Sequence, residues 1–315
     1  MPSPAASGFL AWLHACLAED PRDLAWPREW RLPDGRRTGL FDPHNAALTL
    51  YDVAPGEMAT PDLLPALAAG DEAPALCSRI VVFARPGGGD DWRAAGFGRE
   101  GEVPGFWSDG ATAVLRARTW GPRAGVANPE PPVPAAVAAA PLPPGFTTRI
   151  ADPEDAAAIR DLLAGVFAGY PIPADPGVVR YALAGGLVHG RVAVADTGEI
   201  AAYASAEFQP GGGAPEITDC ATRPARRGLG LMRRLVDELR ADLDRLFGLT
   251  GAYALVRDDG PAMARVLARA GWRRTGRLDG HYRVGDRWIT AHLWLPQPGG
   301  RAAGDRAQIR PGRSD

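Results

Sequence analysis

One stretch in the second half of the chain, residues 216–235, combines a strand-like run, a glycine turn rich in arginine and the start of a long amphipathic segment. Two glycines and three arginines mark the turn: Arg226, Arg227, Gly228, Gly230 and Arg233. Backbone amides at the start of a helix bind anions, and glycine lets a ligand approach them closely. The spacing therefore predicts a site for a pyrophosphate group. The alternative is an ordinary strand-to-helix turn, because one glycine pair is a weak signal.

Two acidic residues precede this turn on the predicted strand 216–222. Glu216 and Asp219 are three positions apart, so they lie on opposite faces of an ideal strand unless a bulge intervenes. At least one of the two should therefore face the site. Each could instead be structural: Glu216 a solvent-facing carboxylate, and Asp219 a hydrogen-bonded acid beside Cys220 that needs a partner if it is buried.

The turn resembles a known family. The segment Arg227-Gly-Leu-Gly230-Leu-Met232 is similar to the pyrophosphate motif of the GNAT acetyltransferase superfamily, Arg/Gln-x-x-Gly-x-Gly/Ala, and follows the strand that this family places there. Met232 departs from the small final residue. Ala270-Gly271-Trp272 resembles the glycine-aromatic pair that ends a helix in that family. The resemblance implies a GNAT acyltransferase fold with acetyl-CoA as co-substrate.

Longer stretches are similar to β-lysine N-acetyltransferases. They lie at residues 166–173, 216–222 and 263–272, and upstream at 96–97, 103–107 and 114–116, so the resemblance covers most of residues 45–297. It implies acetylation of a small amine, with the side-chain amine of β-lysine as the first candidate. Another amino acid, a polyamine or an aminoglycoside-like amine stays open as the acceptor. A non-catalytic acetyl-CoA-binding module also stays open, because Leu267, Ala264 and Met232 replace family residues.

The resemblance also implies roles for individual residues. Glu216 is the first candidate for the general base and Asp219 the second. The cofactor-binding set is Cys220, Ala221, Thr222, Arg227, Gly228, Leu229, Gly230, Leu231, Met232 and Arg233. Tyr170 and Glu207 are the candidates for substrate contact, although Tyr170 could also simply end a helix.

The proton donor for the leaving thiolate is harder to place. The family's usual tyrosine and asparagine would fall near Leu267 and Ala264, so Tyr253, Tyr282 or a water could substitute, and each tyrosine could equally be a packing residue. Cys220 could act as a nucleophile, but no histidine is placed to activate it, and a small buried cysteine is the commoner role.

The helices and strands expected around these residues indicate an α/β protein with a mixed sheet, and the chain divides into two main parts. Residues 1–122 form a GNAT-like but degenerate first lobe without a comparable glycine-basic turn, 123–145 a linker rich in proline and alanine, 146–297 the acetyltransferase domain and 298–315 a disordered tail. The first lobe is expected to contain strands at 47–53, 79–83 and 111–117 and helices at 61–69 and 91–96. In the second part, Asp152 should cap a helix ending near 167, followed by strands at 192–195, 200–208 and 216–222, a helix at 229–247, a strand at 252–256, a helix at 261–270 and a strand at 288–295.

Composition narrows the chemistry further. The net charge is −2, and the basic residues are dispersed among acids, so nucleic acid is not an expected partner. The chain has no lysine, which excludes P-loop and Schiff-base lysine chemistry. The 3 cysteines and 5 histidines lack metal-ligand spacing, and no segment is long and apolar enough to span a bilayer. We therefore expect a metal-free cytoplasmic protein that binds no membrane, and a homodimer stays open.

Overall fold

The computed structural model describes residues 28–31, 37–55, 77–123, 133–138, 140–167, 172 and 175–297. The predicted helix at 61–69 and the predicted tail at 298–315 lie outside these residues. Among the described helices, none combines the length and apolar composition needed to cross a bilayer.

The first lobe is built on a six-stranded sheet with the order β1-β2-β3-β4-β6-β5. Its strands are β1 (Arg28–Arg31), β2 (Arg37–Asp42), β3 (Ala47–Tyr51), β4 (Arg79–Ala84), β5 (Gly98–Val103) and β6 (Ala113–Thr119). β3 and β4 pair in parallel and their neighbours pair antiparallel. The short helix α5 (Gly89–Ala94) joins β4 to β5 and buries Trp92 against one face of the sheet.

Alternation along β4 gives this sheet two apolar faces. Ile80 and Val82 pack with Trp92 on one side, whereas Val81 and Phe83 pack toward the second half of the chain. A strand that is buried on both faces has a continuous run of apolar residues, and β4 has such a run from Ile80 to Ala84.

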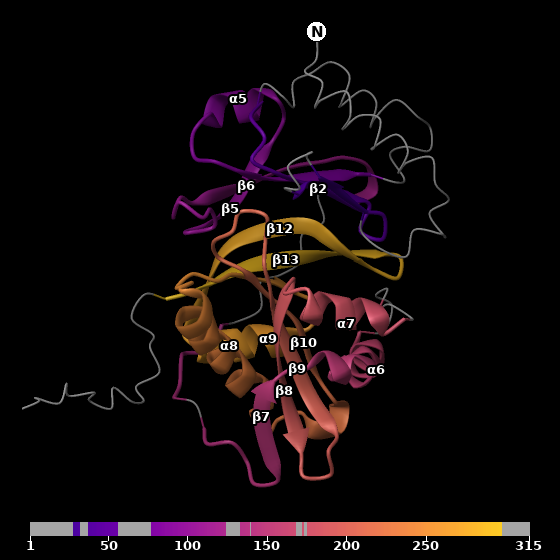
Figure 1. Ribbon diagram of the computed structural model, residues 1–315. Coiled ribbons are helices and arrows are strands. Elements are labelled where there is room, and N and C mark those ends of the chain that lie inside the picture. Colours follow the sequence, from indigo (N-terminus) through magenta and orange to yellow (C-terminus); the bar gives the residue numbers. More distant parts are fainter. Residues whose placement is uncertain are drawn as a thin grey trace, which may run out of the picture.

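The second half contains two further sheets. One has the order β10-β9-β8-β7, from β7 (Phe146–Ile150), β8 (Val188–Ala195), β9 (Ile200–Glu207) and β10 (Glu216–Thr222). The other has the order β11-β13-β12, from β11 (Ala254–Arg257), β12 (Trp272–Val284) and β13 (Arg287–Pro296). Helices α8 (Leu231–Phe247) and α9 (Pro261–Arg269) lie on one side of β8–β10, and α6 (Ala156–Val166) and α7 (Gly177–Ala184) lie on the other (Figure 1).

The side chains of β9 explain these two layers. Ala202, Ala204 and Ala206 are buried against α8, which presents an apolar stripe that includes Leu235 and Leu239. Tyr203, between the alanines, points to the other side and packs with α6. Asp152 caps the 3-10 turn η2 (Pro153–Asp155) that leads into α6: its carboxylate accepts a hydrogen bond from the amide of Glu154, and Asp155 completes a capping box.

The two halves share a core. One buried cluster contains Phe83 and Phe106 from the first lobe together with Tyr253 and Leu293 from the second. Strands β12 and β13 lie directly beneath the first lobe (Figure 1). The loop between β9 and β10 also pairs with the first lobe, through hydrogen bonds from Ser108 N to Gly211 O at 2.7 Å and from Gly213 N to Phe106 O at 2.9 Å. The family-like half therefore packs tightly on the first lobe.

Candidate active site

The strand that carries both acids contains the bulge on which the sequence prediction depended. The pairing register of β10 with β9 shifts between Thr218 and Ala221, and Asp219 has a φ of 50°. A non-glycine residue in this left-handed region is uncommon and marks a local distortion of the strand. The bulge breaks the strict alternation, so Glu216 and Asp219 are not held on opposite faces.

β10 and β11 form a fork. They meet in a parallel bridge between Glu216 and Tyr253, where Ile217 N donates to Tyr253 O at 2.7 Å. Beyond the bridge, β11 pairs with β13 and β10 with β9. Two parallel strands that separate in this way leave the backbone groups on their inner edges free for a ligand.

Glu216 occupies the base of the fork. Its carboxylate accepts hydrogen bonds from the Tyr253 hydroxyl and from the amide of Leu255. Burial, followed by the neighbouring charge of Glu207, raises the pKa of Glu216 to about 8 despite these two bonds. A carboxyl group with this pKa exchanges protons near neutral pH, which is the property required of a general base.

Other polar groups lie on the same side of the sheet. Glu207 is directly opposite Glu216 in the register of β9 and β10, so both side chains share one face. Ser205 Oγ donates to Asp219 Oδ2 at 3.3 Å and is also hydrogen-bonded to the Tyr203 hydroxyl. Burial raises the pKa of Asp219, while the bond from Ser205 lowers it. Three acids thus lie near one another on the face that α6 covers.

The glycine turn follows at the far end of β10. Gly228 and Gly230 have φ values of 81° and 79°, which glycine adopts without strain. Among the described residues, neither amide has a hydrogen-bond acceptor, and a Cβ built on either glycine would meet nothing within 4 Å. Backbone donors before the first turn of a 17-residue helix, facing open space, fit a pyrophosphate group.

The arginines near the turn differ in their surroundings. Arg227 is exposed, with Nε 3.4 Å from Thr222 O. Arg226 instead contacts Glu199 at 3.3 Å. Arg233 pairs with Asp237 at 2.7 Å and donates to the carbonyls of Val137 and Arg269. Arg227 is therefore the side chain best placed to add charge at the turn, and Arg233 attaches the described part of the predicted linker to α8.

The remaining members of the predicted cofactor set divide between surface and core. Leu229 is 41% exposed at the turn, whereas Leu231 and Met232 are buried in the core beneath α8. Met232 thus fills a packing position where the family motif has a small residue. Ala221 is buried, and Thr222 is partly exposed at the end of β10.

Cys220 has the surroundings of a structural thiol. Its Sγ lies 3.4 Å from Thr218 O, and burial together with the charges of Asp219 and Glu216 raises the pKa of the thiol. A thiolate is the reactive form of cysteine, so these surroundings oppose nucleophilic catalysis. The sequence left this role open, and the local electrostatics favour the packing alternative.

Comparisons with known proteins bear on this geometry. Residues 159–272 match the Acetyltransferase (GNAT) family. This segment contains β10, the glycine turn, α8 and the fork with β11. This segment is similar to GNAT acetyltransferase domains. The resemblance predicted from the turn is therefore confirmed, as is the mixed α/β fold.

Two curated relatives each align with about half of the chain. Beta-lysine N(6)-acetyltransferase of Methanosarcina mazei is 34% identical over 157 residues, which cover 49% of this chain and 56% of that protein. N-acetyltransferase YodP of Bacillus subtilis is 29% identical over 155 residues, covering 49% and 55%. The chain thus spans about half the length of the curated relatives it matches.

A solved structure also aligns with about half of the chain. The spermidine N-acetyltransferase of Vibrio cholerae, in complex with CoA and spermine, aligns with a TM-score of 0.42 and 14% identity, over 48% of this chain and 94% of that protein.

In the GNAT domain, neither position expected for the family's tyrosine and asparagine carries a polar group. Leu267 and Ala264 are both buried in the core beneath α8. Tyr253 instead brings a hydroxyl to Glu216, and burial raises its pKa well above the ordinary value. The sequence named Tyr253 only as one of three possible substitutes, because its contact with Glu216 depends on the fork. Tyr282 lies elsewhere, on β12, with its ring 4.6 Å from that of His281.

The first lobe adds a wall behind the fork that sequence reasoning missed. Phe106 stacks 4.8 Å from Phe83 and lies 6.2 Å from the ring of Tyr253. The Tyr51 hydroxyl donates to Gln209 Oε1 at 3.2 Å, in the loop that leads from Glu207 toward Glu216. No sequence signal could have found this wall, because its members lie far apart along the chain.

Two further predictions concern ligands. Tyr170 lies outside the described residues, so its contact with substrate stays a prediction. Within the described ranges, no group of three or more His, Cys, Asp or Glu side chains could hold a metal ion.

Proposed function

We propose that this protein transfers the acetyl group of acetyl-CoA to a small amine, with the side-chain amine of β-lysine as the leading acceptor. The observation that carries the proposal is the Glu216 carboxyl group, whose pKa of about 8 arises at the base of a fork that leads to a turn with free backbone amides. A proton acceptor and an anion site on one strand and its following turn are what amide formation from a CoA thioester requires.

Acetyl-CoA supplies the acyl group as a thioester, and the residues that would hold it are Arg227 and the amides around Gly228 and Gly230. Glu216 takes a proton from the ammonium group of the acceptor, so that the nitrogen lone pair becomes available. The nitrogen forms a bond to the acetyl carbon, and the bond from that carbon to sulfur breaks. The nitrogen loses a second proton as the amide forms, and sulfur, which leaves with the electron pair, takes up one proton. The products are an amide, a free thiol and the proton that Glu216 accepted first.

The acid cluster supports a cationic acceptor. Glu207, Glu216 and Asp219 lie on or near one face, and their mutual repulsion is relieved when an ammonium group enters. An entering cation also lowers the pKa of Glu216, so a larger fraction of this carboxyl group is ionised and able to accept a proton in the complex than in the free protein. β-Lysine carries two amines and is the acceptor in the name of one relative, which supports it as the first candidate.

The experiment follows CoA thiol release with β-lysine and with a panel of other amino acids, polyamines and aminoglycosides. We expect turnover with β-lysine to exceed that with the panel, and to fall by at least about a hundredfold in Glu216→Gln, since a general base contributes roughly that much or more. The exposed Glu154→Gln is the matched control and should keep full activity.

Two results would redirect the proposal. Faster turnover of a polyamine or another amine would replace the acceptor and keep the reaction. Roughly micromolar acetyl-CoA binding, about 8 kcal/mol, without turnover of any amine would instead support a non-catalytic acetyl-CoA-binding module.

A further inference from the structure

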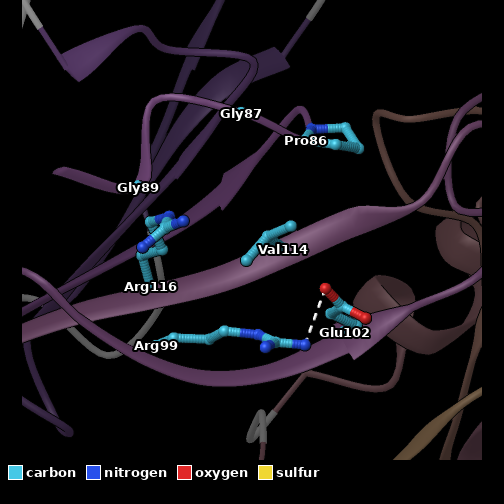
Figure 2. Close-up of a pocket in the computed structure, with 7 residues that line it drawn as sticks. All are labelled: Pro86, Gly87, Gly89, Arg99, Glu102, Val114 and Arg116. Carbon is cyan, nitrogen blue, oxygen red and sulfur yellow. Dashed lines mark ion pairs between the residues drawn. The ribbon is translucent and has the colours of Figure 1, made fainter. Parts of the chain in front are cut away.

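The first lobe contains an open surface cavity of about 250 Å³ that is separate from the fork. Figure 2 shows its lining: Pro86, Gly87, Gly89, Arg99, Glu102, Val114 and Arg116. The turn between β4 and α5 forms one wall, and strands β5 and β6 form the other. Nothing in the proposed acetyl transfer uses this cavity.

Arg116 is the unusual member of the lining. It is 7% exposed, yet within the described residues it has neither an ion pair nor a hydrogen-bond acceptor, and its Nε is fully buried without a partner. Figure 2 shows its side chain extending from β6 toward the turn, and Nη2 lies 3.7 Å from where a Cβ would stand on Gly89. The ring of Trp92 lies 5.9 Å from the guanidinium carbon. A buried charge without a counterion is costly to the fold, so its retention calls for a reason.

Other buried arginines of the described first lobe do have acceptors, although Nε of Arg79 and both Nε and Nη1 of Arg123 are also buried without a partner. Arg79 donates to Thr119 Oγ1 at 2.8 Å and to Asp279 O at 2.9 Å, and it pairs with Glu100. Arg123 donates to the carbonyls of Asn45 and Ala46. Arg116 differs from Arg79 and Arg123 because, within the described residues, no nitrogen of its guanidinium group has an acceptor.

The other charges in the cavity cancel. Arg99 and Glu102 form an ion pair of 2.7 Å, drawn in Figure 2, which leaves Arg116 as the uncompensated charge of the lining. The turn adds backbone donors: Gly87 and Gly88 have φ values of 113° and 59°, and within the described chain their amides donate no hydrogen bond. The cavity thus offers one positive charge and neutral donors beside apolar groups from Pro86 and Val114.

We propose that this cavity binds a small monocarboxylate, whose two oxygens pair with the guanidinium group of Arg116 and whose short apolar part lies against Val114 and Pro86. A planar guanidinium matches a carboxylate with two parallel hydrogen bonds. One negative charge neutralises the cavity, whereas a phosphate dianion would leave excess charge beside Glu102. No sequence pattern predicted this site, because its basic residue comes from β6 and not from the glycine turn itself.

The test uses propionate and inorganic phosphate as probes of the full-length protein, with binding followed by calorimetry. We expect one saturable propionate site in the wild-type protein and an affinity at least tenfold lower in Arg116→Met. Arg118→Met is the matched control, because Arg118 lies on the same strand but donates to Ala95 O at 3.1 Å and does not line the cavity. Phosphate should bind this site more weakly than propionate.

A second pair of measurements separates this site from the anion turn of the GNAT domain. Gly230→Asp should keep propionate binding, since the added carboxylate lies at the start of α8. If Arg116→Met does not fold, Arg116→Lys is the second variant. Lysine retains the positive charge but cannot form two parallel hydrogen bonds with a carboxylate, so it should also lower the affinity for propionate. Equal propionate affinity in wild type and the Arg116 variant that folds, loss of binding in Gly230→Asp alone, or tighter binding of phosphate at this site would each overturn the proposal.

Discussion

The proton equilibrium of one side chain, Glu216, links the stability of this protein to its proposed chemistry. Sequence alone placed Glu216 and Asp219 as candidates and identified a bulge as the condition for bringing them together. The bulge is present, and Asp219 has a positive φ within it. The residue type alone could not have predicted this backbone conformation. The partnership of Glu216 with Tyr253 could not be predicted, because it depends on where two parallel strands meet and not on local sequence.

Glu216→Gln should change stability in a manner that depends on pH. Folding raises the pKa of Glu216 from 4.5 to about 8, so its protonated form is favoured in the folded state. The stability that this group contributes is fully present below its unfolded pKa and is lost as the pH rises through this window, at roughly 1.4 kcal/mol per pH unit. We expect the free energy of unfolding of Glu216→Gln, relative to that of wild type, to rise by roughly 3 kcal/mol between about pH 5 and about pH 7.5. Urea unfolding at the two pH values measures this difference. A difference that does not change with pH would contradict the raised pKa.

Tyr253→Phe tests the hydrogen bond that Glu216 receives. The Tyr253 hydroxyl stabilises the charged carboxylate and so lowers its pKa, which means that its removal should raise the pKa of Glu216 further. We expect the Glu216-dependent limb of kcat/KM against pH to move to higher pH, with roughly a tenfold loss of kcat/KM near neutral pH. Tyr282→Phe, on β12 and away from the fork, is the control and should leave the limb in place. An unmoved limb in Tyr253→Phe would show that the hydroxyl does not tune this carboxylate.

At the scale of elements, the strongly patterned segments were predicted well. The predicted strand at 216–222 coincides with β10. The predicted helix at 229–247 starts two residues before α8, which begins at Leu231 because Gly228 and Gly230 adopt left-handed backbone. β12, from Trp272 to Val284, was missed. Its residues are mostly half-buried, its pairing contains two register shifts, and its arginines and glycines obscure the alternation. α7, which buries no residue completely, gave no recognisable stripe either.

Gly230→Ala separates backbone strain from ligand binding at the turn. A residue with a Cβ at a φ of 79° costs roughly 1–2 kcal/mol of folding free energy, and here the added atom meets no neighbour. We expect acetyl-CoA affinity, measured by calorimetry, to fall by at least about tenfold as the amides shift. Gly198→Ala is the matched control, since Gly198 has a φ of 83°, equal open space and a position in the turn between β8 and β9. Equal loss of affinity in both variants would mean that the turn has no special role.

At the scale of the whole molecule, the feature that local patterns could not reveal is the contact between the halves. The sequence predicted a division with a linker at 123–145, and the boundaries of these parts stay a prediction. The shared aromatic cluster and the pairing of the β9–β10 loop with residues 105–108 arise from chain segments far apart in the sequence. Only the folded arrangement shows that Gly211–Gly213, in the loop between β9 and β10, lies against the first lobe.

Gly213→Ala should weaken this contact. A Cβ on Gly213 would stand 2.1 Å from Gly105 O and 2.6 Å from Phe106 O, which are backbone atoms that cannot move independently. We expect the free energy of unfolding to fall by about 2 kcal/mol, as is typical of overpacking, and acetyl transfer to fall with it because the loop leads to Glu216. Gly165→Ala, where a Cβ in α6 meets nothing within 4 Å, should leave both unchanged or slightly improve stability. Chemical denaturation and thiol release measure the two effects, and a Gly213→Ala protein as stable as wild type would contradict the close packing.

The pairing of Gly211–Gly213 with the first lobe also limits how parts of this protein can be moved into other chains. A gene fusion that transferred only the GNAT-matched segment to a new host chain would leave Tyr253 and the β9–β10 loop without the residues that cover them. Substitutions on either side of this contact are therefore constrained by the residues on the other side. The exposed apolar surface of an isolated half would favour aggregation before any loss of chemistry could be measured.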